Sequence, residues 1–123
     1  MTSMTSHTDI AQALVTAIEL GDADGIAALY ADSVAIWHNF DDKTQSRAEN
    51  LGTLAGFIKT ISNRKYTEIR CQETATGFVQ QHVLTGTFQD GRLLNMPCCL
   101  IVEVVDGKIT RLDEYLDPSP FSR

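Results

Sequence analysis

Apolar residues in the first part of the chain recur at the spacing of an α-helix. Ile10, Leu14 and Ile18 are each four residues apart, and they give residues 8–20 one apolar stripe. Gly21 follows at the position where a glycine commonly ends a helix. The pattern therefore predicts an amphipathic first helix that packs its stripe against the rest of the domain.

Two further helices and one strand are predicted before the pattern changes. Asp22 can cap a second, shorter helix, and residues 33–38 alternate in the manner of a strand. Ser46 and Glu49 have the spacing of a capping box, which predicts that a third helix begins there and ends near Asn63. The helices are thus concentrated in the first half of the chain.

From residue 66 onward the apolar period changes from 3.6 to 2, which is typical of strands. The segments that show it are 66–73, 78–89, 92–105 and 108–116. Asp-Gly pairs at 90–91 and 106–107 predict tight hairpins between the last three strands. Gly86 and Pro97 interrupt regular strands and predict bulges that would curve the sheet.

Helices followed by a meander of strands indicate an α+β fold, with the helices on one face of an antiparallel sheet. We expect three N-terminal helices packed on a curved antiparallel sheet, forming a cone with an internal pocket. The 123 residues fit a single domain over 1–123, in which 1–6 and 118–123 are tails.

Charge and composition narrow the class of partner. The chain carries 16 acidic and 10 basic residues, a net charge of −6, and its basic residues form no stripe. This balance argues against nucleic acid and anionic membranes as partners. The polar start has no apolar signal core, and three cysteines with two adjacent do not form a disulfide framework. We therefore expect a cytoplasmic protein with reduced thiols.

Three titratable side chains lie on strand faces that are otherwise apolar: His38, His82 and Glu114. A buried carboxylate needs a partner, a proton or a cavity, and a histidine beside it can transfer protons near neutral pH. The hypothesis is that His38, Glu114 and His82 converge in one pocket. The alternatives are satisfied core histidines, a carboxylate at a solvated sheet edge, and a metal site, for which no ligand spacing is present.

Cys98 and Cys99 must point to opposite faces of one strand, and both faces are apolar. Cys99 shares its face with Ile101, while Cys98 shares the other with Leu100 and Val102. One face should line the interior, and the other needs a cover that the chain's own helices do not supply. A second copy of the chain is the simplest cover, so we expect a homodimer through the outer sheet face.

Two segments carry a resemblance to a known superfamily. Residues 21–32, Gly-Asp-Ala-Asp-Gly-Ile-Ala-Ala-Leu-Tyr-Ala-Asp, and residues 106–115, Asp-Gly-Lys-Ile-Thr-Arg-Leu-Asp-Glu-Tyr, resemble the nuclear transport factor 2-like superfamily. It includes ketosteroid isomerases, limonene epoxide hydrolases and SnoaL-type polyketide cyclases. The resemblance covers nearly the whole chain and implies the cone fold, which hosts many chemistries as well as pure binding.

The resemblance to ketosteroid isomerases is incomplete at the residues that matter. Their basic aspartate corresponds to His38, which can still accept a proton. Their two oxyanion donors fall on Leu14 and Cys99, of which a leucine donates no hydrogen bond and a thiol only a weak one. Steroid isomerisation by that mechanism is therefore not expected.

The resemblance to epoxide hydrolases and cyclases is also partial. The catalytic aspartate of limonene epoxide hydrolases corresponds to Glu114, and their Tyr-x-Asn pair is similar to residues 37–39, where Asn39 is retained. Their Arg-x-Asp pair falls on Gln81 and Val83, which leaves that triad incomplete. SnoaL-type cyclases use a single acid–base group, which His38 or Glu114 could supply.

Together these observations predict a cofactor-independent acid–base enzyme of isomerase, cyclase or epoxide-hydrolase type, without a metal. Its substrate would be a small apolar carbonyl, polyketide-like or epoxide-like molecule, with His38 as general base or acid and Glu114 as its partner. The predicted substrate-binding residues are Leu14, Asn39, Phe57, His82, Cys99, Ile101, Leu112 and Leu116. The alternative is a non-catalytic binder of small ligands, or a dimerisation module whose pocket is vestigial.

Overall fold

The computed structural model describes residues 6–122. Its first half contains three helices whose capping residues are recognisable in the sequence. They are α1 (His7–Leu20), α2 (Ala23–Leu29) and α3 (Arg47–Thr60). The Ser6 hydroxyl accepts the Asp9 N–H at the start of α1, and Gly21 ends the helix in the left-handed conformation, with φ of 71°. Ser46 and Glu49 form the predicted capping box of α3.

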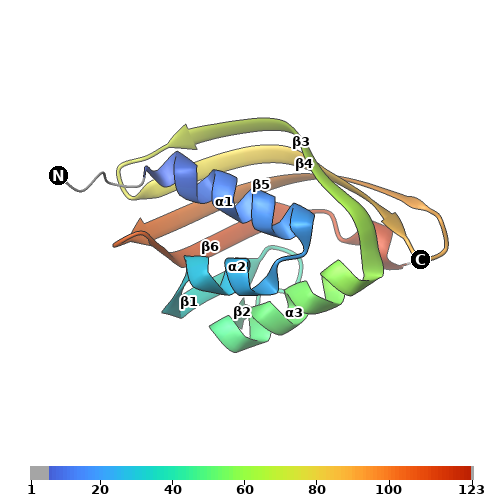
Figure 1. The fold of residues 1–123 in the computed structure, drawn as a ribbon, viewed down its shortest axis with the longest axis horizontal. Helices are drawn as coiled ribbons and strands as arrows, with labels where there is room; N and C mark the ends of the chain where they lie inside the picture. Colours follow the sequence, from blue (N-terminus) through green and yellow to red (C-terminus); the bar gives the residue numbers. More distant parts are fainter. Residues whose placement is uncertain (1–5, 123) are drawn as a thin grey trace.

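The strands form one six-stranded sheet within the described residues (Figure 1). They are β1 (Tyr30–His38), β2 (Thr44–Gln45), β3 (Ile61–Glu73), β4 (Gly77–Phe88), β5 (Leu93–Val105) and β6 (Lys108–Leu116). Their order is β2-β1-β6-β5-β4-β3. The sheet is mixed, because β1 runs parallel to β6 while the other neighbouring pairs are antiparallel. The predicted α+β class is confirmed, and the parallel pair corrects the expected all-antiparallel sheet.

The hairpins follow the predicted turns, and one of the two predicted strand irregularities, that at Gly86, is present. Asp106 and Gly107 both have positive φ, 52° and 76°, as a type I′ turn requires. The pairing of β4 with β5 runs without a shift past Gly86 and Pro97. Gly86 instead gives room to a neighbour, since a Cβ there would lie 2.4 Å from Cγ2 of Ile61. On its other side, β4 pairs with β3 through a register shift between Ser62 and Lys65, which lies opposite Gly86, whereas no shift is found at Pro97.

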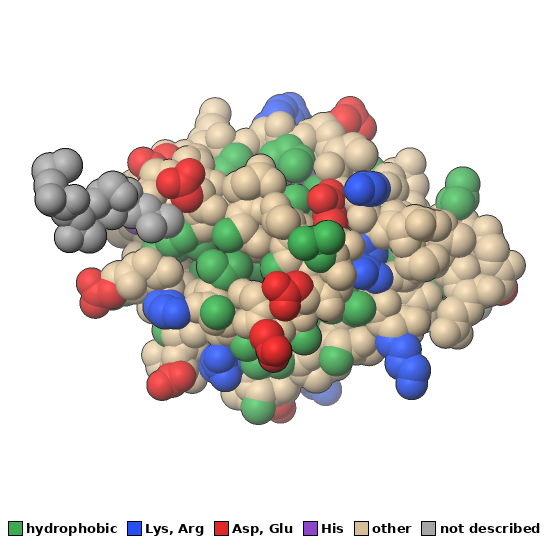
Figure 2. Space-filling view, viewed as in Figure 1, with side chains coloured by type: hydrophobic (Ala, Val, Ile, Leu, Met, Phe, Trp, Pro, Cys, Tyr) green, Lys and Arg blue, Asp and Glu red, His purple; other side chains and the backbone are tan. Residues whose placement is uncertain are grey.

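All three helices cover one face of the sheet, and the apolar core lies between them (Figure 1). On β5 the core-facing positions are Leu94, Met96, Cys98, Leu100, Val102 and Val104. The alternate residues of the same strand lie on the opposite, uncovered face, where Cys99 is half-buried and the others, including Ile101, are exposed. Among residues 6–122 no helix is long and apolar enough to cross a membrane. Acidic and basic side chains are interspersed over the face seen in Figure 2.

The end of the chain does not leave the fold as predicted. Ser119–Ser122 form a short 3-10 helix, η1. The Phe121 ring contacts Phe57 and Phe88 edge-on, with ring centres 6.4 and 5.7 Å apart. The segment therefore packs against α3 and β4. Of the two predicted tails, residues 1–5 and 123 lie outside the described part of the chain.

Candidate active site

A cavity of about 370 Å³ lies between the inner face of the sheet and helices α1 and α3. Its walls are mainly apolar, with Leu14 from α1, Phe57 from α3, and Leu112 and Leu116 from β6. Phe121 of η1 also belongs to the wall. A volume of this size is at the lower end of the range for small-molecule sites. The fold thus provides the predicted interior, with room for a compact apolar ligand.

The cavity wall contains one ionisable pair, His38 and Glu114. His38 is the last residue of β1, Glu114 lies near the end of β6, and the two are directly paired in the parallel register of these strands. Nε2 of His38 lies 3.1 Å from Oε1 of Glu114, and the side chains are only 12% and 21% exposed. Because an ionised carboxylate can only accept, the imidazole N–H is the donor. The structure therefore brings together the two residues predicted to be catalytic.

The environment of His38 favours its protonated form. The hydrogen bond to Glu114 raises the pKa of His38, burial opposes that rise, and the negative charges of Glu114 and Asp41 add to it. An imidazolium ion is consequently stabilised at this position. Glu114 thus both orients the ring and balances the charge that His38 acquires when it takes up a proton.

A second set of polar side chains near the cavity is joined by hydrogen bonds and consists of Tyr30, Asn50 and Gln45. The Tyr30 hydroxyl donates to Oδ1 of Asn50 at 2.8 Å, and Nδ2 of Asn50 donates to Gln45 at 2.9 Å. Tyr30 and Asn50 are both buried and both border the cavity. Burial, together with the nearby charge of Glu114, raises the pKa of Tyr30, so its phenol stays neutral. This network anchors α3 against β1.

His82 lies on β4 beside the cavity wall and is 97% buried, with 3% of its surface exposed. Its Nδ1 is 3.1 Å from Nε2 of Gln80, and its ring centre is 4.6 Å from that of Tyr66, which does line the cavity. Burial lowers the pKa of His82, which keeps the ring neutral. Its Nε2 has no hydrogen-bond partner within residues 6–122.

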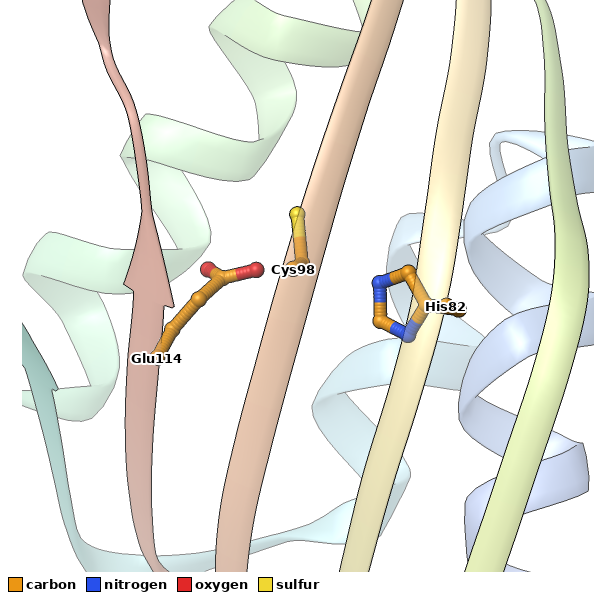
Figure 3. A group of neighbouring side chains, drawn as sticks. All are labelled: His82, Cys98 and Glu114. Carbon is orange, nitrogen blue, oxygen red and sulfur yellow. The ribbon is translucent and has the colours of Figure 1, made fainter.

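His82, Cys98 and Glu114 rise from three neighbouring strands and point toward one another (Figure 3). One ligand-type atom of each residue lies within 4.8 Å of the other two. The Cys98 thiol donates to the carbonyl oxygen of Met96 at 3.4 Å, and burial raises the pKa of this thiol. A histidine, a cysteine and a glutamate are the kinds of side chain that bind zinc, so this group is the one that could hold a metal in the described chain.

The predicted binding residues divide into three groups. Leu14, Phe57, Leu112 and Leu116 line the cavity as expected. His82 lies behind the wall rather than in it. Asn39 is exposed, and its side-chain oxygen accepts the backbone N–H of Leu116 at 3.0 Å, so it holds β1 to β6 instead of facing a ligand.

Cys99 and Ile101 are on the wrong side of the sheet for the role predicted for them. Cys98 is paired with His82 in the β4–β5 register, and it is Cys98 that faces inward. The two predicted residues therefore point outward, away from the cavity. Since both faces of β5 are apolar, alternation alone gave no means of choosing between them.

Several wall residues were missed by the sequence reasoning, chiefly Tyr30, Asn50, Tyr66 and Phe121. Asn50 is the one buried residue of α3, and its position directly after Glu49 of the capping box carries no distinctive signal. Tyr66 begins the period-2 pattern and could have been assigned to an inward face. Phe121 lies in a segment that reads as a tail.

Comparison with known proteins identifies the family. A sequence profile described as the SnoaL-like domain matches residues 11–112. The chain belongs to the SnoaL-like family. This SnoaL-like protein also has the fold of the nuclear transport factor 2-like superfamily, as the resemblance of its two segments predicted. A search of curated proteins found no match.

Solved structures similar to the SnoaL-like protein share its fold over nearly their whole length. A candidate polyketide cyclase from Pseudomonas putida is 18% identical, with a TM-score of 0.84, covering 97% of this chain and 96% of that one. An LEH-like epoxide hydrolase from M. tuberculosis is 16% identical, with a TM-score of 0.76 and coverage of 92% and 84%. A ketosteroid isomerase-like protein from Catenulispora acidiphila, in complex with trimethylamine, is 16% identical, with a TM-score of 0.77 and coverage of 87% and 84%. At these identities the similarity shows the fold alone.

Proposed function

We propose that this SnoaL-like protein is a cofactor-independent acid–base enzyme that acts on a small apolar carbonyl, polyketide-like or epoxide-like substrate. The observation that carries the proposal is the hydrogen bond between His38 and Glu114, 3.1 Å long, in the wall of a mainly apolar cavity. A histidine whose ring is held by a carboxylate is suited to accept and return a proton near neutral pH.

The proton transfer follows from the arrangement of the pair. Neutral His38 takes a proton from a substrate C–H or from a water molecule, and the ring becomes an imidazolium ion. Glu114 stabilises that ion through the Nε2–H hydrogen bond and does not itself need to be protonated. The imidazolium then returns the proton to a different atom of the substrate, which completes an isomerisation, a ring closure or an epoxide opening.

Among the reaction types considered, the leucine at position 14 argues against the ketosteroid isomerase mechanism. Its side chain lies in the cavity wall where the resemblance places an oxyanion donor, and it offers no hydrogen. The other expected position, Cys99, faces away from the cavity. The relatives named as a polyketide cyclase and as an epoxide hydrolase agree with the broad class only.

Substrate and mechanism are tested in two steps. A thermal-shift screen with steroids, aromatic polyketides, terpenoid epoxides and lactones first selects a ligand, since a ligand at a hundred times its Kd adds about 2.7 kcal/mol to stability. Turnover of that ligand is then compared in wild type, His38→Ala and the outer-face control Ile101→Ala. The expected loss of kcat for His38→Ala is roughly 10²- to 10⁴-fold, with ligand affinity changed only a few-fold.

The same measurements separate the two alternatives. A non-catalytic binder predicts that His38→Ala changes nothing, while Leu112→Ala weakens binding because Leu112 is part of the wall. A vestigial pocket predicts no thermal shift with any compound of the panel. Either result would overturn the enzyme proposal.

We also propose that the uncovered outer face of the sheet joins two copies of the chain. Apolar side chains on that face include Ile101, Val105 and Tyr115, each more than 40% exposed. Their strands belong to one sheet whose other face is covered by the helices. An isologous dimer would remove this apolar surface from water.

A further inference from the structure

The hydrogen bond between Gln80 and His82 fixes which ring nitrogen of His82 carries the proton. Both side chains are buried, at 2% and 3% exposure, and their nitrogens are 3.1 Å apart. An amide nitrogen can donate but cannot accept. Nδ1 of His82 is therefore the acceptor, and the neutral ring carries its hydrogen on Nε2.

That Nε2–H is a buried donor whose partner is not supplied by residues 6–122. Leaving a buried donor unpaired costs about 1–3 kcal/mol, so such a group calls for an explanation. A ring nitrogen of His82 lies within 4.8 Å of a carboxylate oxygen of Glu114 and of the Cys98 sulfur, and Figure 3 shows the ring turned toward both. One oxygen of Glu114 is bonded to His38, and the other has no hydrogen-bond partner in the described chain. A donor and an acceptor thus face the same small space at the edge of the cavity (Figure 3).

The positions of the hydrogens distinguish a hydrogen-bonded oxygen from a metal ion. Two hydrogen bonds of about 2.8 Å that meet at the tetrahedral angle of an oxygen atom span about 4.6 Å, which a separation of no more than 4.8 Å allows. The hydrogens favour an oxygen atom over a metal ion as the bound group, because Nε2 of His82 carries a hydrogen and the Cys98 thiol donates its own to Met96. Neither atom presents a lone pair to a metal in this arrangement.

We propose that His82 and Glu114 together bind a neutral hydroxyl group, which accepts a hydrogen bond from Nε2–H and donates one to the carboxylate. The hydroxyl belongs either to an apolar substrate or to a water molecule that takes part in the reaction. This inference rests on the proposed function for the identity of the cavity as the substrate site, and it narrows the substrate class to molecules that present or receive an O–H group there.

The first test reads the tautomer of His82 directly in the wild-type protein. Long-range ¹H–¹⁵N spectra of histidine-labelled protein distinguish Nε2–H from Nδ1–H and from imidazolium, and His82→Phe assigns the signals. The expected result is a neutral Nε2–H ring at pH 7. A ring protonated on Nδ1, or on both nitrogens, would overturn the proposal whether or not any variant folds well.

The second test compares two ligands that differ only at the hydroxyl. Calorimetric titration with 2-naphthol and with 2-methoxynaphthalene, which cannot donate, should give wild type about a tenfold or greater preference for 2-naphthol, as expected for a hydrogen bond to a charged acceptor. The preference should disappear in Glu114→Leu, which removes the acceptor of the ligand hydroxyl, and persist in His38→Ala. His82→Phe should weaken the binding of both compounds, because either ligand oxygen can accept from Nε2–H. The preference should also persist in Cys98→Ala, which keeps both proposed partners. Equal affinities in wild type, no binding of either compound, a preference that survives in Glu114→Leu, or unchanged affinities in His82→Phe would contradict the proposal.

A crystal structure without and with 2-naphthol identifies the source of the hydroxyl. We look for an ordered water that is hydrogen-bonded to both side chains in the structure without ligand. If the naphthol oxygen displaces this water, the site binds a substrate hydroxyl. If the water stays in place, it is a reactant water. Zinc binding in stoichiometric amount that is lost in Cys98→Ala would overturn both. None of these measurements needs turnover. The hydroxyl site can therefore be confirmed even if the acid–base proposal is wrong, and it can be refuted even if His38→Ala abolishes activity.

Discussion

The coupling between His38 and Glu114 can be measured without knowing the substrate. Both side chains border the cavity, so leucine at either position removes the polar group while keeping an apolar wall. We consider the variants His38→Leu and Glu114→Leu and the double variant that combines them. A double-mutant cycle on the free energy of unfolding then isolates the pairwise interaction.

The geometry sets the expected size of the coupling. A hydrogen bond to a charged partner contributes about 1.5–3 kcal/mol, while an exposed ion pair contributes about 0–1 kcal/mol. With side-chain exposures of 12% and 21%, the pair lies between these limits and nearer the buried one. The cycle should therefore give a coupling free energy of about 1–2 kcal/mol at pH 6, measured by urea denaturation.

The pH dependence of the coupling follows from the raised pKa of His38. A histidine that binds its proton more tightly in the folded state stabilises that state below its unfolded pKa, near 6.5. This contribution disappears as the pH rises through the higher folded value. Above that value a neutral imidazole still donates to Glu114, but roughly half as strongly. The coupling should consequently fall between pH 6 and pH 9.

Two results would refute this reasoning. A coupling of zero within error at pH 6 would mean that the contact at 3.1 Å is not maintained in solution. A coupling that grows as the pH rises would mean that the neutral ring, not the imidazolium, is the form that Glu114 stabilises. Either outcome would also remove the main support for His38 as the acid–base residue.

Three other predictions concern the framework that positions the site. Tyr30→Phe leaves the buried oxygen of Asn50 without its donor and should lower the free energy of unfolding by about 1–3 kcal/mol in urea titration. Gly77→Ala would place a Cβ 1.8 Å from the Val102 carbonyl oxygen, so a destabilisation of at least about 3 kcal/mol, or no folded protein, is expected by circular dichroism. Ile101→Asp should convert the proposed dimer to a monomer in sedimentation equilibrium.

Each of these variants has a control elsewhere in the chain. Tyr115→Phe removes a phenol that makes no hydrogen bond within residues 6–122 and should change stability by less than about 0.5 kcal/mol. Gly52→Ala adds a Cβ into open space on α3 and should be neutral or stabilising by up to about 1 kcal/mol. Leu20→Asp, at 74% exposure on α1, should leave the sedimentation behaviour unchanged. Matching effects in a variant and its control would contradict the corresponding prediction.

The helices and turns could be predicted because their determinants are local. Ser46 and Glu49 specify the start of α3 by contacts with each other, and Gly21 specifies the end of α1 by its own backbone conformation. Asp106 and Gly107 likewise adopt the type of turn that an Asp-Gly pair favours. In each case the interaction that selects the structure spans four residues or fewer, so one sequence contains it.

What failed depends on pairing between distant segments. The parallel contact of β1 with β6 joins residues 76 positions apart, and no local pattern encodes it. Which alternate residues of β5 face the core is likewise set by the pairing of this strand with β4, where Cys98 is opposite His82. The residues of β5 themselves are apolar on both faces and do not decide it. His38 and Glu114 were nevertheless found, because a titratable group on an apolar face is conspicuous whichever partner it later meets.

Glu114 is the residue on which both proposals converge, and this limits what its substitution can show. One of its oxygens accepts from His38, and an oxygen of the same carboxylate lies within 4.8 Å of a ring nitrogen of His82. Glu114→Gln would therefore disturb proton transfer and hydroxyl binding together. The two histidines lie on different strands and approach the carboxylate from opposite sides of β6, His38 from β1 and His82 from β4. His38→Ala and His82→Phe separate the functions: the first should remove turnover but keep the preference for a hydroxyl ligand, and the second should weaken the binding of 2-naphthol and of 2-methoxynaphthalene while leaving the His38–Glu114 hydrogen bond in place.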